Sequence, residues 1–361
     1  MERSQGRVER SQGEERRFCR ALEELSPAYF GMVMATGIVS LAAHFMGRPV
    51  IAGVLLALNL VAYPLLWALY ALRLWRFPRR VLSDLTSHQS ASGFFTLVAA
   101  SCVLGSQSLL LMGWYRFALA LWGVALVLWL ALTYTIFTAF TIKAEKPAFE
   151  KSISGGWLLA VVATQSIALL GALVAAHMPP LYRLEVNFLA LSMWLWGGML
   201  YIWMMSLIFY RYSFFHFSPG DLAPPYWINM GAMAISTLAG AQLILNAPDA
   251  PFLLSLRPFL KGFTVFYWAT GTWWIPMLLI LAVWRYVYKR FPLRYDPLYW
   301  GAVFPLGMYA ASTHNMQRAL AMPFLDTLAT VFLYVALTAW AVTFYGLCQR
   351  IIRMLARCAD R

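Results

Sequence analysis

Residues 299–320, YWGAVFPLGMYAASTHNMQRAL, form a stretch that is long enough to cross a bilayer as a helix, yet it carries features that a simple anchor does not need. Phe304 is followed by Pro305, with glycines nearby on both sides, and polar residues occupy positions 312–315. Proline removes a backbone hydrogen bond to the preceding turn, and polar side chains at membrane depth are usually kept where a helix faces protein or water. This stretch therefore predicts a helix that lines a path through a membrane.

Apolar runs of about 20 residues recur along the rest of the chain. Of its 361 residues, 61% are hydrophobic and 12% are charged, and the mean hydropathy is +0.65, which excludes a water-soluble domain of this size. The predicted helices span 27–46, 50–75, 88–112, 115–138, 155–176, 185–210, 225–247, 258–286, 299–320 and 327–353. We expect an all-α integral membrane protein with an N-terminal tail at 1–26, one ten-helix transporter or channel domain at 27–353, and a C-terminal tail at 354–361.

The positive charges predict the orientation. Of the 28 Lys and Arg residues, 22 lie in the two tails and in every second loop, and the remaining loops carry few. By the positive-inside rule both termini are then cytosolic, and we expect a multi-pass protein of the plasma membrane. The net charge of +13 follows from this asymmetry and suits anionic lipid, so it does not indicate binding to nucleic acid.

Tryptophan and small residues alternate between successive helices. Twelve of the sixteen Trp residues fall in the even-numbered predicted helices, whereas Gly, Ser and Thr are enriched in the odd-numbered ones. Bulky aromatics suit lipid and the membrane interfaces, and small residues allow close approach of helices or a polar cavity. We therefore expect five consecutive helical hairpins around a central pore, with the odd helices inside. An ordinary bundle in which the Trp placement is accidental is the alternative.

Small, polar or apolar residues at helical spacing are the candidates for the pore wall. For each helix taken singly, packing against a neighbouring helix is the favoured interpretation, and only the recurrence in five helices favours a pore. The candidate pore-lining residues are Val33, Thr36, Gly37, Ser40, Ser92, Thr96, Ala160, Thr164, Asn229, Met233, Ser236, Gly240, Met308 and Ala311.

Ionisable residues lie near the ends of the predicted helices, so a carboxylate-based proton relay is not expected. His314 is the residue that could titrate within a path, although a lone histidine in a helix more often bonds to a neighbour. No nucleophile with a base, carboxylate pair or phosphate-binding loop stands among the helices, and no Cys or His spacing suggests a metal site. We therefore expect neither an enzyme nor a cofactor.

An apolar path without fixed charge needs something that controls its wetting. Phe304 beside the Pro305 kink is the candidate gate, because a hydrophobic side chain can close a pore by dewetting or obstruction. The alternative is a core or lipid-facing aromatic. The basic cytosolic surface, the peptide N–H groups near helix breaks and the absence of acidic rings favour anions over cations.

Four segments together resemble the tellurite-resistance/dicarboxylate transporter family. They are SPAYFGMVMATGIVS at 26–40, PPYWINMGAMAIST at 224–237, FYWATGTWWIPML at 266–278 and YWGAVFPLGMYAAST at 299–313. That family includes bacterial tellurite-resistance proteins, fungal malate permeases and sulfite pumps, and slow-type anion channels of plants. The resemblance implies a homotrimer with a pore through the five hairpins of each protomer, and a pore-occluding phenylalanine that matches Phe304.

The leading hypothesis is that the protein passes small anions, either C4-dicarboxylates such as malate or inorganic anions, through a pore gated by Phe304. Proton-coupled dicarboxylate uptake or sulfite efflux is a second hypothesis, in which His314 would titrate. A membrane scaffold or receptor that transports nothing is a third.

Overall fold

The computed structural model describes residues 19–293 and 295–359, and within these ranges the chain is helical and contains no strand. Nine helices of this part are long and apolar enough to cross a membrane. A further helix of 21 residues, α13 (Trp300–Leu320), is more polar and runs through Pro305 without interruption. The prediction of an all-helical protein is confirmed.

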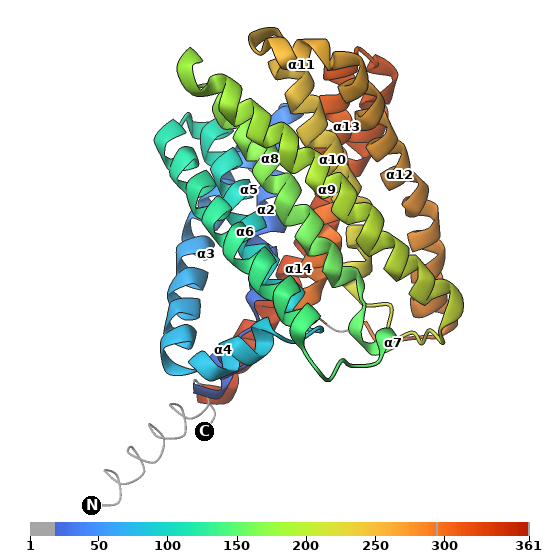
Figure 1. Ribbon diagram of the computed structural model, residues 1–361. Helices are drawn as coiled ribbons and strands as arrows, with labels where there is room; N and C mark the ends of the chain where they lie inside the picture. The colour runs from blue at the N-terminus through green and yellow to red at the C-terminus, as the bar shows by residue number, and fades with distance from the viewer. Residues whose placement is uncertain (1–18, 294, 360–361) are drawn as a thin grey trace, which may run out of the picture.

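The long helices fall into two sets that alternate along the chain (Figure 1). The inner set consists of α2 (Phe30–Phe45), α5 (Phe95–Met112), α8 (Leu159–Ala175), α10 (Ile228–Asn246) and α13. The outer set consists of α3 (Pro49–Arg76), α6 (Tyr115–Ile142), α9 (Pro180–Phe214), α12 (Arg257–Val283) and α14 (Asp326–Ala359). The sequence did not predict the short helices α4 (Pro78–Leu85), α7 (Phe149–Ser152) and α11 (Pro251–Ser255), because none is long or apolar enough to stand out.

Each inner helix begins with a short 3-10 turn. The turns are η1 (Pro27–Tyr29), η2 (Ala91–Phe94), η3 (Gly155–Leu158), η4 (Pro224–Trp227) and η7 (Pro297–Tyr299). Proline suits the first position of three of them because its missing N–H would have no partner there. The side chains of Ser26 and Asp296 accept hydrogen bonds from the backbone of η1 and η7 and cap them. The entry into α2, α10 and α13 is thus encoded locally.

The inner helices contact one another in a closed cycle. α2 packs against α5, α5 against α8, α8 against α10, α10 against α13, and α13 again against α2. The outer helices cover this cycle, since α3, α6, α9 and α14 each contact two inner helices and α12 contacts α10 and α13. These contacts close the cycle, but they do not give the width of a passage through it. The arrangement of five hairpins around a pore therefore stays a prediction.

The two sets differ in burial. In the most apolar stretch of α2, α5, α8 and α10, 72 to 100% of the residues are buried, against 17 to 56% in the outer helices. The exposed residues of the outer helices include large apolar side chains such as Trp75, Ile280 and Val342. Such a surface suits hydrocarbon rather than water.

The tryptophans of the outer helices do not all face outward, as the composition suggested. Trp122, Trp129, Trp194 and Trp274 are buried, and Trp194 is fully so. Their indole N–H groups donate to other helices, which explains why they are turned inward.

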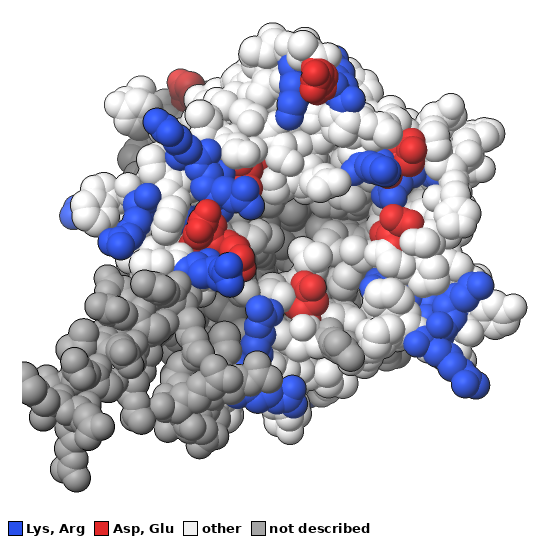
Figure 2. Space-filling view, turned by 90° about the horizontal axis from the view of Figure 1, so that it is seen from below, with Lys and Arg blue, Asp and Glu red and all other residues white. Residues whose placement is uncertain are grey.

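The described chain begins and ends at the same end of the bundle, here called the terminal end, which also carries α4 and α7 (Figure 1). Residues 19–23 are helical, and Leu22 is buried there. Figure 2 shows this face, on which Lys and Arg side chains gather toward the edges with Asp and Glu among them. Residues 1–18 of the expected N-terminal tail and the last two residues of the C-terminal tail lie outside the described residues.

Candidate functional site

The contacts of α13 define which of its sides faces which neighbour. An ideal Cβ at Gly231 of α10 would lie 2.8 Å from the Cγ of Pro305, so Pro305 faces α10. Gly307 faces α2, because its own ideal Cβ would lie 2.9 Å from Val39. Thr313 faces the outer layer, since its hydroxyl accepts a hydrogen bond of 3.0 Å from Trp268 of α12. Three sides of α13 are therefore occupied by helices.

Phe304 lies on the fourth side of α13. Residues of an α-helix are about 100° apart, so Phe304 lies about 180° from Thr313 and between the directions of Pro305 and Gly307. This is the side turned away from the outer helices and toward the interior of the cycle. Met308 and Ala311 share this side at helical spacing, and all three side chains have no exposed surface.

The expected pore-lining residues of α2 contact other helices. Thr36 accepts a hydrogen bond of 2.9 Å from the indole of Trp340 on α14. The hydroxyl of Ser40 donates to the carbonyl of Ala52 on α3, and an ideal Cβ at Gly37 would collide with side chains of α3 and α5. Val33, on the same side, accepts at its carbonyl from an amide of α3. These contacts favour the helix-packing interpretation for this side of α2.

The expected residues of the predicted helix 88–112 lie near its start, Ser92 in η2 and Thr96 in the first turn of α5. Thr96 donates to the carbonyl of Pro27 in η1 and also bonds to Gly93. The hydroxyl of Ser92 lies 3.0 Å from the position that a Cβ on Gly156 would take, so Ser92 faces η3. Both residues therefore connect the first turns of neighbouring inner helices at the terminal end.

The expected residues of α8 face an outer helix. Thr164 accepts a hydrogen bond of 2.8 Å from Trp129 of α6 and donates to the carbonyl of Ala160. The indole of Trp122, also on α6, lies 3.0 Å from the ideal Cβ of Gly171. Ala160, Thr164 and Gly171 share one side at helical spacing, so this side of α8 packs against α6.

The expected residues of α10 repeat this arrangement. The carbonyl of Ser236 accepts a hydrogen bond of 2.8 Å from Trp194 of α9, and the same indole leaves room only for glycine at Gly240. The amide of Asn229 donates to a tyrosine of α9 at 3.3 Å. Met233 lies against Gly271 of α12. The small residues of α10 thus accommodate aromatic side chains of the outer layer.

An aromatic side chain from an outer helix is hydrogen-bonded to each inner helix, a feature that the sequence pattern did not predict. The five pairs are Tyr63 with Ser101, Trp129 with Thr164, Trp194 with the carbonyl of Ser236, Trp268 with Thr313, and Trp340 with Thr36. The alternation of Trp with Ser and Thr along the chain was the available signal. It reflects hydrogen bonds between the two layers. A donor or acceptor left without a partner in surroundings of low dielectric constant costs free energy, so these bonds favour the contact between the layers.

His314 lies at the end of α13 away from the terminal end. Its Nδ1 is 3.9 Å from a carboxylate oxygen of Asp326, and its ring stacks on Phe45 of α2. Gln317 donates to the same carboxylate at 2.8 Å. His314 is therefore grouped with polar residues near the start of α14 and lies three turns along α13 from Phe304.

Charge is distributed unevenly in the interior. Among residues 19–293 and 295–353, the buried charged side chains are Arg73, Arg211 and Arg285, and all three stand at the ends of outer helices on the terminal side. No group of three or more potential metal ligands occurs in the described part of the chain. The interior of the cycle thus carries no described acidic side chain that would attract cations.

The sequence is similar to a known protein family and to several known proteins. The family model described as SLAC1, voltage-dependent anion channel, matches residues 24–348. An uncharacterized membrane protein of Mycobacterium tuberculosis is 37% identical over 158 residues, which cover 44% of this chain and 80% of that protein. An uncharacterized transporter of Methanocaldococcus jannaschii is 26% identical over 89% of this chain and 92% of its own length. A sulfite efflux pump of Arthroderma benhamiae is 23% identical over 90% of each chain.

Proposed function

The chain belongs to the voltage-dependent anion channel family, and we propose that it passes small anions across the plasma membrane through the interior of the five-helix cycle. The substrates would be C4-dicarboxylates such as malate, or inorganic anions. Phe304 would close the path, Pro305 would hold it in position, and Met308 and Ala311 would continue the wall along α13. The positive-inside rule supports cytosolic termini, and a homotrimer remains part of this proposal.

The orientation of Phe304 is the observation that carries the proposal. Its neighbours Pro305, Gly307 and Thr313 contact α10, α2 and α12, which leaves the phenyl ring on the side turned to the interior. A large apolar ring in a passage enclosed by apolar helices excludes water, and a passage without water does not conduct ions. Movement of this ring would therefore open the path.

The sign of the charges supports anions. Of the 28 Lys and Arg residues, 22 lie in the two tails and in every second loop, which the positive-inside rule puts on one side of the membrane. An excess of positive charge on that side raises the local concentration of anions and repels cations. The likeness to a sulfite efflux pump adds sulfite to the anions that should be tested.

Proton-coupled carriage is the second candidate, and the pairing of His314 with Asp326 favours it over other coupled mechanisms. In that case an imposed pH gradient would drive accumulation of a dicarboxylate, and His314→Ala would abolish this accumulation. A passive channel would show neither effect.

Electrical recording from the purified protein in planar bilayers tests the proposal. Currents carried by chloride, nitrate, sulfite or malate, with reversal potentials that follow the anion gradient, are the expected result. A folded protein that carries no current and no radiolabelled anion in any of these solutions would overturn it and leave the scaffold hypothesis.

A further inference from the structure

Three outer helices end in a buried arginine on the terminal side. Arg73 is in the last turn of α3, Arg211 is in the last turn of α9, and Arg285 is in the π-turn η6 (Trp284–Tyr288) that continues α12. These three arginines are 1%, 7% and 6% exposed, in that order. A buried guanidinium is costly unless an anion or several acceptors surround it.

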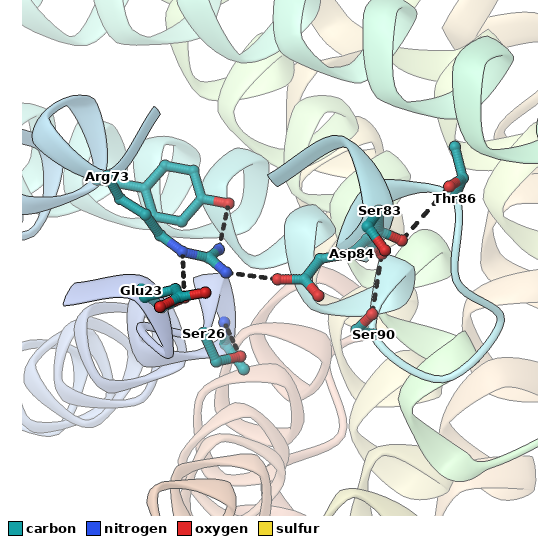
Figure 3. A network of polar contacts seen from close by, with 9 residues as sticks. Glu23, Ser26, Arg73, Ser83, Asp84, Thr86 and Ser90 are labelled. Atoms are coloured by element: carbon teal, nitrogen blue, oxygen red, sulfur yellow. Dashed lines mark hydrogen bonds and ion pairs between the residues drawn. The ribbon is translucent and has the colours of Figure 1, made fainter. Parts of the chain in front are cut away.

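Arg73 has such a partner. It forms an ion pair with Asp84 and donates to the carbonyl of Glu23, as Figure 3 shows, and it also contacts the hydroxyl of Tyr70. Asp84 lies eleven residues after Arg73 in the sequence. The short helix α4, which follows α3, therefore supplies the anion.

Arg211 also has a carboxylate partner, although its Nε has no hydrogen-bond partner among the described residues. Its guanidinium lies 3.1 Å from Asp221, which comes ten residues later, and donates to the carbonyl of Ile153 and the hydroxyl of Tyr226, both at 2.6 Å. The loop after α9 supplies this carboxylate.

Arg285 differs from both. No carboxylate of the described residues lies within 4.0 Å of its guanidinium. Its Nε has no hydrogen-bond partner among them, as is also true of the Nε of Arg211, so the missing carboxylate is what sets Arg285 apart. Two aromatic rings lie beside it: the guanidinium carbon is 4.3 Å from the ring centre of Phe291 and 5.1 Å from that of Tyr286. Asp296, eleven residues later, stands at the equivalent place in the sequence but caps η7 and is exposed. The guanidinium therefore lacks the anion that the other two have.

A cavity of about 170 Å³ lies beside this guanidinium, between α12, η4 and α13. Its walls include Leu278 and Ala282 of α12 and Leu306 of α13, and Arg285 is its charged member. The linked hydroxyls of Tyr286 and Tyr299, 2.9 Å apart, also border it. Cavities of about this size accept small apolar groups when their walls are apolar. The cavity thus joins one cationic group to an apolar wall.

We propose that this cavity binds an anionic membrane lipid, with a phosphate oxygen on Arg285 and the upper part of an acyl chain against Leu278, Ala282 and Leu306. An oxyanion would replace the carboxylate that Arg73 and Arg211 receive from the segments that follow α3 and α9. By helical spacing, the flank of α12 beside Ala282 and Tyr286 is apolar and exposed at Leu279 and Val283, so hydrocarbon adjoins the site. Basic pockets between helices at a membrane surface bind acidic head groups in this way.

Native mass spectrometry of the delipidated protein with phosphatidylglycerol, and with phosphatidylcholine for comparison, tests the proposal. We expect a preference for phosphatidylglycerol that Arg285→Gln reduces at least about tenfold, because a charge-assisted hydrogen bond is lost. Lys289→Gln removes the same charge four residues away at an exposed position and should leave the preference intact. Equal binding by wild type and Arg285→Gln would overturn the site.

Two further variants test the cavity and the partner of Arg285 separately. Ala282→Phe fills the cavity without touching the charge and should also lower phosphatidylglycerol binding; unchanged binding would contradict the cavity. Asp296→Asn should leave binding as it is, whereas binding that arises only in this variant would show that Asp296 is the true partner of Arg285. Displacement of the lipid by millimolar inorganic phosphate would overturn the lipid assignment in favour of a free anion. None of these measurements depends on anion current, so failure here leaves the proposed function untouched.

Discussion

Trp340 of α14 donates its indole N–H to the hydroxyl of Thr36 on α2 across 2.9 Å and 304 residues of sequence. This bond joins the last helix to the first inner helix and completes the series of aromatic side chains that connect the outer layer to the inner one. It also turns the hydroxyl of Thr36 toward the outer layer.

Loss of this bond should destabilise the bundle. Trp340→Phe keeps an aromatic ring but removes the donor, and Thr36→Val removes the acceptor at nearly constant volume. We expect each to lower the free energy of unfolding by about 0.5–1.5 kcal/mol. Denaturant unfolding in detergent measures both, and the double variant should cost less than the sum because the two changes remove one bond. Strict additivity would contradict the coupling.

Removal of the Phe304 ring should open the proposed path. Phe304→Ala is expected to raise anion conductance by about an order of magnitude or more, since the ring no longer excludes water. Phe304→Leu should give an intermediate value.

Phe30→Ala is the matched control for this gate. Phe30 is also buried on an inner helix, but its ring packs against Tyr63 and Trp67 of α3. Its truncation should cost stability, about 3–5 kcal/mol, without raising the conductance. Equal currents from Phe304→Ala and wild type, with protein that remains folded, would remove Phe304 as the gate.

Gly240 should tolerate no side chain. A Cβ there would overlap the Thr264 hydroxyl and lie 2.9 Å from the Trp194 ring, so Gly240→Ala should lower the melting temperature. Gly262→Ala is the matched control, because no atom lies within 4 Å of its ideal Cβ. There the gain in helix propensity of up to about 1 kcal/mol should keep or raise the melting temperature. A stable Gly240→Ala variant would show that α9 and α10 can separate.

The Asp221 carboxyl should make stability depend on acid pH. Burial raises its pKa, but hydrogen bonds from Ser218 and the guanidinium of Arg211 outweigh burial and bring the pKa below its ordinary value of 3.8. A group whose pKa is lower in the folded state stabilises the fold above the unfolded pKa, and this contribution is lost as the pH falls from about 3.8 through the folded value.

Thermal unfolding of the wild type and Asp221→Asn between pH 7 and pH 3 measures this effect. The wild type should be more stable than the variant near pH 7, and the difference should shrink at the acid end as the carboxylate becomes protonated. A difference that does not change over this range would show that the Asp221 carboxylate makes no pH-dependent contribution.

The chain's apolar runs were sufficient to predict the helical class and the approximate places of the long helices. Length and apolarity are local properties, and a backbone in hydrocarbon must satisfy its hydrogen bonds within its own helix. The 299–320 prediction agrees closely with α13, whereas 88–112 includes residues before η2 that are not helical. Ends differ because loops and caps depend on partners elsewhere.

Which side of each inner helix faces inward depended on the tertiary structure. Thr36, Thr164 and Gly240 each belong to a set of small residues at helical spacing on their own helix. That spacing shows which residues share a side, but it does not show which helix the side contacts. The structure puts aromatic rings of the outer helices against them. On α13 alone, Pro305 and Gly307 occupy the flanks and leave Phe304 on the interior side. The sequence by itself determined what could enter the membrane, and only the packing of large side chains against small ones decided which surfaces meet.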